Sequence, residues 1–273
     1  MPYFESELGH KVYYEHHGQA GPVIVLIHGL GSSTRIWVQQ IQSLKKYCQV
    51  LAFDFPGHGQ SDWQETYSIE ELCKVLLRLL QVCKIQTASL AGLSLGCSVA
   101  LTFAIHYPER VEKLILESPI GGYHKKWNPL GWLDQLVFRL LPLAIELAIH
   151  LFGAPATIHW LDTFGVKKMK RNFKVLETVQ QKADPRALRD LLWDSASTPY
   201  TGKLNRITAP ALLIRGSDDP FPKRFVTYIR THLRQVTYVE VPNTRHLVAM
   251  EKSREFNRLV LSFLKLSSLA PDQ

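Results

Sequence analysis

The sequence predicts an α/β protein: a doubly wound, mostly parallel, eight-stranded sheet with a helical cap inserted after the sixth strand. Three observations carry this prediction. Apolar runs with little polar alternation recur along the chain, as is typical of strands covered on both faces. Helical patterns separate most of these runs, which indicates a parallel sheet. Residues 118–210 form an interval too long for one crossover, and prolines divide it into helical segments.

The expected strands fall into two groups. Two short alternating segments, residues 3–6 and 11–15, flank Leu8-Gly9-His10 and predict an antiparallel hairpin at one edge of the sheet. Six apolar runs predict the other strands: residues 23–27, 49–53, 87–91, 113–117, 211–215 and 236–241. Among the helices, residues 68–82 have the clearest pattern, because Ser68 and Glu71 form a capping box ahead of periodic leucines.

The long interval divides the chain into two parts. Residues 1–119 and 205–273 are expected to form the α/β core, and residues 120–204 the helical cap. The cap carries 12 basic and 7 acidic residues, a net charge of +5. It also contains four of the six tryptophans, which either pack its own interior or form an apolar wall for a substrate.

Composition excludes several classes of protein. The chain has 273 residues, of which 46% are hydrophobic and 21% charged, so disordered and fibrous structures are excluded. Lys and Arg exceed Asp and Glu by 8, a surplus too modest to indicate a nucleic-acid partner. The most apolar stretch, residues 130–152, contains Asp134, Arg139, Glu146 and a central Pro142, so we expect buried helix rather than a transmembrane segment.

The cysteines and the first 14 residues indicate the cellular compartment. The four cysteines form no CxxC pair and have no close-set histidines, so neither a metal site nor a disulfide framework is expected. Residues 1–14 lack the apolar run of a secretory signal. A reducing, cytoplasmic location is therefore the expectation.

The strongest chemical motif is Gly92-Leu93-Ser94-Leu95-Gly96, which lies between an expected buried strand and a helical pattern. This is the context of a nucleophile elbow, in which a serine stands on a strained turn and glycines on either side relieve crowding. We therefore expect Ser94 to be a nucleophile.

A serine hydroxyl needs a general base to become an effective nucleophile. Among the histidines, His246 follows the last expected strand and so lies at the carboxyl edge of the sheet, where Ser94 also emerges. The hairpin histidines lie far from that edge, and His232 lies within an expected helix. His246 is the expected base.

Three acids could orient that base. Asp218 and Asp219 directly follow the strand at residues 211–215, and Glu117 ends the preceding strand. An aspartate at 218 or 219 completes the order Ser, Asp, His along the chain, which is the hydrolase order. Spacing from the strand leaves these two open.

A glycine-rich turn, His28-Gly29-Leu30-Gly31, follows the strand at residues 23–27. It would place the Leu30 amide opposite the Leu95 amide, and two such donors form an oxyanion hole. A phosphate-binding loop is the rival interpretation, but no Gly-Lys-Ser/Thr follows.

Together these motifs resemble the α/β-hydrolase fold superfamily, in its serine-nucleophile, capped branch of esterases, lipases and thioesterases. The resemblance also includes residues 54–61, which are similar to the family's structural turn and are assigned no catalytic role. The family's acid usually stands three residues after the glycine, which favours Asp219 over Asp218. The chain departs from the pattern at Cys97 and Arg245, where the family often has glycine.

The resemblance implies a serine hydrolase acting on carboxylic esters or thioesters of an apolar acyl group, without a cofactor or metal. A C–C bond hydrolase or related synthase is one alternative, and a ligand-binding sensor with a slow triad is another. Residues 167–174 carry five cations. They form either a solvated helix face or a patch that attracts an acidic acyl carrier, coenzyme A or an anionic membrane surface.

Overall fold

The computed structural model describes residues 2–120, 140, 143–144, 147, 151, 183–197, 203–221 and 223–266. These residues form an eight-stranded sheet in the order β1-β2-β4-β3-β5-β6-β7-β8. The strands are β1 (Tyr3–Glu5), β2 (Lys11–His17), β3 (Val23–Ile27), β4 (Gln49–Phe53), β5 (Ala88–Leu93), β6 (Val111–Glu117), β7 (Ala211–Gly216) and β8 (Val236–Val241). From β4 to β8 every neighbouring pair is parallel, whereas β1 and β2 are antiparallel.

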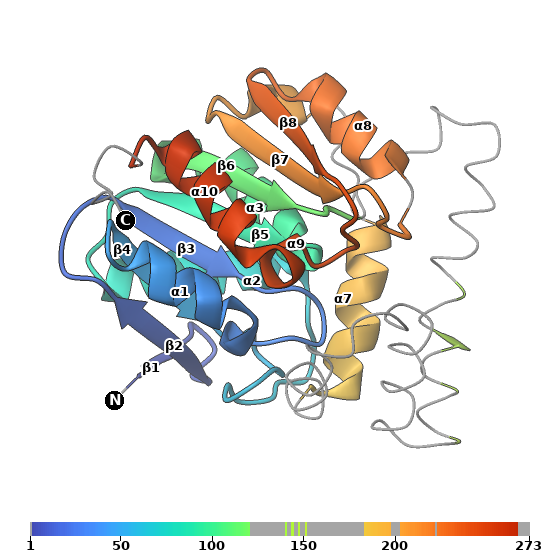
Figure 1. Cartoon of the computed structure of the whole chain (residues 1–273). Helices are drawn as coiled ribbons and strands as arrows, with labels where there is room; N and C mark the ends of the chain where they lie inside the picture. The colour runs from blue at the N-terminus through green and yellow to red at the C-terminus, as the bar shows by residue number, and fades with distance from the viewer. Residues whose placement is uncertain are drawn as a thin grey trace.

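Helices cover both faces of the sheet (Figure 1). One face carries α1 (Val38–Leu44), α9 (Val248–Glu251) and α10 (Ser253–Leu264); the other carries α2 (Ile69–Val82), α3 (Leu95–His106) and α8 (Lys223–His232). Short 3-10 helices lie at Thr34–Trp37, Pro108–Arg110 and Leu204–Arg206. The predicted doubly wound, mostly parallel sheet is confirmed.

The apolar runs form strands because each side of the sheet has its own hydrophobic core. Along β3, Val23, Val25 and Ile27 enter one core, and Ile24 and Leu26 enter the other. Successive side chains point to opposite faces of a strand. Both faces are therefore apolar, and no polar position interrupts the run.

Most element boundaries agree with the sequence. The structure begins β6 at Val111, before the predicted residue 113, and continues β5 to Leu93. At α2, Ser68 Oγ accepts a hydrogen bond from the Glu71 amide at 3.1 Å. The Glu71 carboxylate instead accepts from Lys74 Nζ at 2.7 Å, which leaves only half of the predicted capping box.

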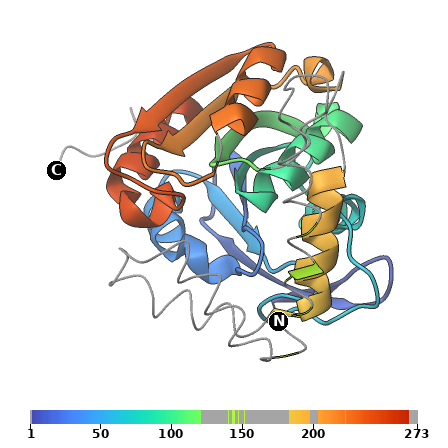
Figure 2. The same ribbon diagram turned by 90° about the vertical axis from the view of Figure 1, so that its right-hand side faces the viewer.

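Within the predicted cap, the structure describes helix α7 (Pro185–Ser197). It stands beyond the carboxyl ends of the parallel strands (Figures 1 and 2). Three of the cap tryptophans and the basic residues 167–174 lie outside the described residues. In the described part of the chain, no helix is both long and apolar enough to cross a bilayer.

Candidate active site

Ser94 stands at a sharp turn between β5 and α3, with φ +53° and ψ −112°. A side chain rarely adopts this positive φ, so the surrounding packing must hold it. A Cβ atom on Gly92 would overlap the carbonyl of Gly96, and one on Gly96 would overlap the carbonyl of Ile27. The two flanking glycines therefore permit strand, serine and helix to approach as closely as they do.

Three hydrogen bonds to main-chain carbonyls hold this turn. The Ser94 amide donates to the Glu117 carbonyl at 2.9 Å, which ties the turn to the neighbouring strand β6. Cys97 Sγ donates to the carbonyls of Gly92 at 3.0 Å and Glu117 at 3.2 Å. The cysteine that departs from the family pattern thus links the end of β5 to the end of β6.

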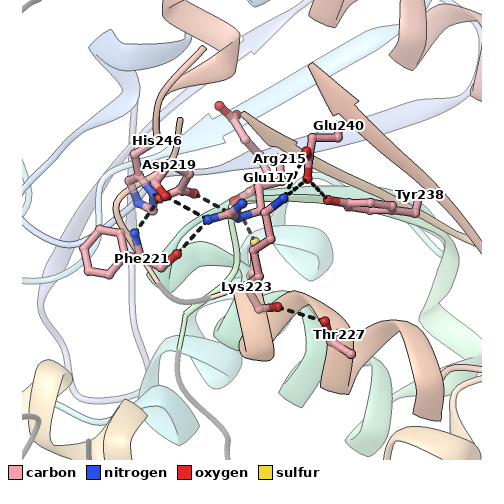
Figure 3. Close-up of polar contacts among 10 residues, drawn as sticks. Glu117, Arg215, Asp219, Phe221, Lys223, Thr227, Tyr238, Glu240 and His246 are labelled. Carbon is pink, nitrogen blue, oxygen red and sulfur yellow. Dashed lines mark hydrogen bonds and ion pairs between the residues drawn. The ribbon is translucent and has the colours of Figure 1, made fainter. Parts of the chain in front are cut away.

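His246 and Asp219 form a close pair at the carboxyl edge of the sheet (Figure 3). His246 lies between β8 and α9, and its Nδ1 is 3.2 Å from both carboxylate oxygens of Asp219. The Phe221 amide donates to Asp219 Oδ1 at 3.0 Å, and the Phe221 ring lies 4.6 Å from the imidazole, centroid to centroid. One loop therefore supplies both the acid and a wall for the base.

The Asp219 carboxylate is almost completely buried. Burial by itself raises the pKa of Asp219, but the hydrogen bond and charge of His246, the Phe221 amide and Arg215 outweigh it. The pKa of Asp219 consequently lies below its ordinary value, and the carboxylate is ionised at neutral pH.

Asp218 has different surroundings. Its amide donates to the Thr244 carbonyl at 2.9 Å, while its exposed carboxylate accepts from Ser217 Oγ at 2.8 Å. The structure thus brings Asp219, and not Asp218, against His246.

Arg215 is a residue of this site that the sequence analysis did not single out. Its guanidinium is buried, and its Nη2 donates to the carbonyls of Asp219 at 2.8 Å and Phe221 at 2.7 Å (Figure 3). Its Nε lies 3.8 Å from Asp219 Oδ2. A signal was available, because an arginine that ends an apolar run on a strand buried on both faces needs a partner of opposite charge.

Glu117, the third candidate acid, contacts the segment after His246 rather than the imidazole. Its side chain is fully buried, and Oε1 accepts a hydrogen bond from the Ala249 amide at 2.8 Å. Among the described residues, its carboxyl makes no hydrogen bond with His246.

The loop after β3 packs directly against the serine. A Cβ atom on Gly29 would lie 3.4 Å from Ser94 Cβ, so this loop passes beside the Ser94 turn. The Phe55 amide donates to His28 Nε2 at 3.0 Å, which leaves His28 Nδ1 to donate to the Gly29 carbonyl at 2.7 Å. Burial holds the pKa of His28 well below its ordinary value, and the neutral ring braces the loop.

The two amides predicted for an oxyanion hole are available at this point. Leu95 is the first residue of α3, where an amide has no partner within its helix, and Leu30 follows Gly29 on the packed loop. In the described structure neither amide donates a hydrogen bond within the protein.

Asp54 has a structural position. Its carboxylate accepts from the amides of Thr34 at 2.6 Å and Gln60 at 2.8 Å, and it closes the turn at residues 54–61.

A Ser–His–Asp triad also requires a hydrogen bond between the serine and the histidine, and this bond is not formed. In the part of the chain that the structure describes, Ser94 Oγ makes no hydrogen bond with His246. Such bonds are often long without substrate and shorten when it binds. The chain therefore provides a serine on a strained turn and an Asp–His pair at the same sheet edge.

Two relatives have similar length. A 3-oxoadipate enol-lactonase 1 of Acinetobacter baylyi is 27% identical over 249 residues, which cover 89% of each chain. A 2-hydroxy-6-oxononadienedioate/2-hydroxy-6-oxononatrienedioate hydrolase of Burkholderia vietnamiensis is 28% identical over 271 residues, covering 93% of this chain and 91% of that protein.

Solved structures share the fold. The enol-lactonase from Burkholderia xenovorans LB400 has a TM-score of 0.81 at 24% identity, with 97% of this chain and 100% of that chain covered. An esterase from Exiguobacterium antarcticum has a TM-score of 0.85 at 18% identity, with 96% and 98% covered. The sequence pattern of the α/β hydrolase fold family matches residues 22–253. The match spans most of the chain, which therefore belongs to the α/β hydrolase fold family.

Proposed function

We propose that this protein is a serine hydrolase that cleaves a carboxylic ester or thioester of an apolar acyl group. The observation that carries the proposal is the buried Asp219–His246 pair at the sheet edge where Ser94 stands on its strained turn. An ionised carboxylate on Nδ1 leaves Nε2 free to accept a proton from a serine.

The reaction follows from these groups. Ser94 Oγ attacks the carbonyl carbon while His246 Nε2 takes the hydroxyl proton, and Asp219 stabilises the resulting imidazolium. The amides of Leu30 and Leu95 donate to the oxyanion. The imidazolium then returns its proton to the departing alcohol or thiol, which leaves an acyl-serine. Water, deprotonated by His246, hydrolyses this ester and restores the free serine.

A C–C bond hydrolase is the second candidate. It is favoured by the relative from Burkholderia vietnamiensis, whose name describes a hydrolase of 2-hydroxy-6-oxononadienedioate. The same serine, base and oxyanion donors would serve that reaction, so the two candidates differ in substrate.

A cytoplasmic location is part of the proposal. It is supported by the four cysteines, which are all free thiols, three of them buried.

A fluorophosphonate probe tests the nucleophile. The wild type should be labelled at Ser94, and Ser94→Ala should lose labelling and at least about 10³-fold in turnover. Intact mass and peptide mapping locate the label. An alanine variant with full activity would rule out Ser94 as the nucleophile.

An acyl-chain series of activated esters and thioesters tests the substrate class. Wild type and Ser94→Ala should be assayed side by side, with a vinylogous 1,5-diketone as the C–C substrate. We expect turnover of esters or thioesters that rises with apolar chain length. Turnover of the diketone alone would support the second candidate instead.

A further inference from the structure

Glu117 occupies a central place between the parts of the site. It ends β6, the strand between β5, which leads to Ser94, and β7, which leads to Asp219. Its main-chain carbonyl accepts the Ser94 amide at 2.9 Å. Its buried side chain extends to the segment that follows His246, where Oε1 accepts the Ala249 amide at 2.8 Å.

The segment that Glu117 holds is short, and the side chain of Ala249 is buried in the core. Helix α9 has four residues and begins two residues after His246. Amides in the first turn of a helix have no partner inside it, so a side chain must satisfy them. Glu117 does this for the Ala249 amide, and Gln40 Nε2 donates to the Ala249 carbonyl at 2.7 Å. The peptide groups of Ala249 thus fix the start of α9, and with it the path of the chain at His246.

The charges around Glu117 favour a neutral carboxyl. Asp219 in the loop after β7 and Glu251 in α9 disfavour its charged form, and the buried Arg215 lies against Asp219. From α3, the neutral Cys97 thiol donates to the Glu117 main-chain carbonyl. Glu117 Oε2 has no hydrogen-bond partner within the described structure. Burial raises the pKa of Glu117 to about 8 despite the amides of Ala249 and Val248, and Asp219 and Glu251 raise it further.

We propose that Glu117 is a positioning residue that joins the Ser94 turn to the segment carrying His246. This inference rests on the serine-hydrolase function proposed above. Glu117 touches no reacting atom; its main chain sets the serine amide, and its side chain sets the base.

Two substitutions separate the effect of the hydrogen-bond acceptor of Glu117 from the effect of its charge. Glu117→Gln keeps the shape and an oxygen acceptor for the Ala249 amide, and it cannot ionise. Glu117→Leu removes the acceptor. We expect Glu117→Leu to lower kcat by about tenfold or more with KM changed less than about twofold, because a misplaced base weakens the transition state rather than substrate binding. Glu117→Gln should restore most of that loss at pH 7.

The dependence of kcat on pH distinguishes a positioning role from a purely structural one. A purely structural side chain would leave the shape of the pH profile unchanged. Above pH 8 the wild type should lose kcat, because an ionised Glu117 repels Asp219 and Glu251 in a buried site without a partner for Oε2. Glu117→Gln should lack this alkaline fall. Gln40→Leu is the matched control, because it removes the hydrogen bond to the Ala249 carbonyl without removing a titrating group. In this variant kcat should still fall above pH 8.

Different results would contradict the role of Glu117 and the proposed function. An alkaline fall that persists in Glu117→Gln, or wild-type kcat in Glu117→Leu, would overturn the role of Glu117 while fluorophosphonate still labels Ser94. A wild type that is not labelled at Ser94 would overturn the proposed function, and this inference with it. Circular dichroism and thermal unfolding establish that each variant is folded.

Discussion

Asp218 and Asp219 are adjacent in sequence but have opposite surroundings. Asp219 is buried against His246, whereas the Asp218 carboxylate is exposed and accepts from Ser217. An ion pair in a site of low dielectric constant interacts far more strongly than one in water. Only one of these carboxylates is therefore placed to stabilise an imidazolium.

We expect Asp219→Asn to lower kcat by about 10³-fold or more, because an amide favours the wrong imidazole tautomer and does not stabilise the positive ring. Asp218→Asn is the matched control and should change kcat by less than about threefold, because its exposed carboxylate bonds to Ser217 and not to His246. Steady-state kinetics of the two variants measures this. If Asp218→Asn were the inactive variant, the assignment would be reversed.

Glu117 also predicts how stability depends on pH. Its pKa is about 8 in the folded protein, against an ordinary value of 4.5. Between these values the folded state keeps the proton and the unfolded state loses it, so the wild type loses stability as pH rises, at up to about 1.4 kcal/mol per pH unit. Below pH 4.5 the contribution is fully present, and above pH 8 no more is lost.

We therefore expect the free energy of unfolding of Glu117→Gln, relative to wild type, to increase from pH 5 to pH 8 and then level off. Urea denaturation at each pH measures it. Glu109→Gln, at an exposed glutamate, is the control for the chemical change and should show no such rise. A difference that does not vary with pH would contradict a neutral, buried Glu117.

Helix α7, which lies within the predicted cap, is attached to the core by hydrogen bonds near both of its ends. Asp184 precedes the helix as its N-cap, and its Oδ1 accepts the Arg186 amide at 3.0 Å. Pro185, the first helical residue, suits this position because its fixed φ is helical and its missing amide is not needed. The buried Tyr67 hydroxyl donates to Asp184 Oδ2 at 2.7 Å, and near the far end of α7 Asp194 accepts the Ile69 amide at 2.7 Å.

Loss of the Tyr67 hydroxyl should loosen this attachment. Tyr67→Phe leaves a buried carboxylate oxygen and the Gln64 amide each without one partner, so we expect a loss of about 1–3 kcal/mol in the free energy of unfolding. Tyr238→Phe removes an exposed hydroxyl bond to Glu240 and should cost less than about 0.5 kcal/mol. Chemical denaturation compares the two. Equal losses would mean that Tyr67 does not anchor α7.

For the whole molecule, the sequence predicts that the basic net charge takes part in substrate binding. The chain carries a formal charge of +8 at pH 7, of which the range 120–204 contributes +5, as 12 basic minus 7 acidic residues. The basic residues 167–174 lie outside the described residues, so their part in binding stays a prediction from the sequence. Steering of an acidic substrate by such charges weakens as salt shortens the Debye length.

We expect kcat/KM for coenzyme A or acyl-carrier thioesters to fall between 0.01 M and 0.1 M salt, where the Debye length shortens from about 30 Å to about 10 Å. Neutral short esters should show no such fall. Replacing Lys167, Lys168, Lys170 and Arg171 by Gln should abolish the difference between the two substrates. The same salt response for both in the wild type would leave these residues as ordinary solvated surface.

Much of the architecture was predictable because it depends on local pattern. The runs at Val23–Ile27, Gln49–Phe53 and Val236–Val241 match the predicted strands residue for residue. Strand boundaries moved where pairing extends beyond the apolar run, as at Val111, which pairs with Ala88. Hydrophobicity marks where a strand is buried, whereas its ends depend on the neighbouring strand.

The amino-acid pattern predicts the order of strands and helices, the sharp turn at Ser94, and the sheet edge to which Ser94, His246 and the acid loop belong. These follow from glycine spacing, apolar runs and the rule that parallel strands end at one edge. The partners of the buried charges follow from the three-dimensional packing: Arg215 lies against Asp219, and Glu117 accepts the Ala249 amide in the helix after His246. Glu117 and Ala249 are 132 residues apart, and although Arg215 and Asp219 are only four apart, nothing local shows that the loop after β7 turns its carboxylate back toward the arginine. Which partner a buried charge finds depends on how the packed strands juxtapose their ends, and no local pattern encodes that.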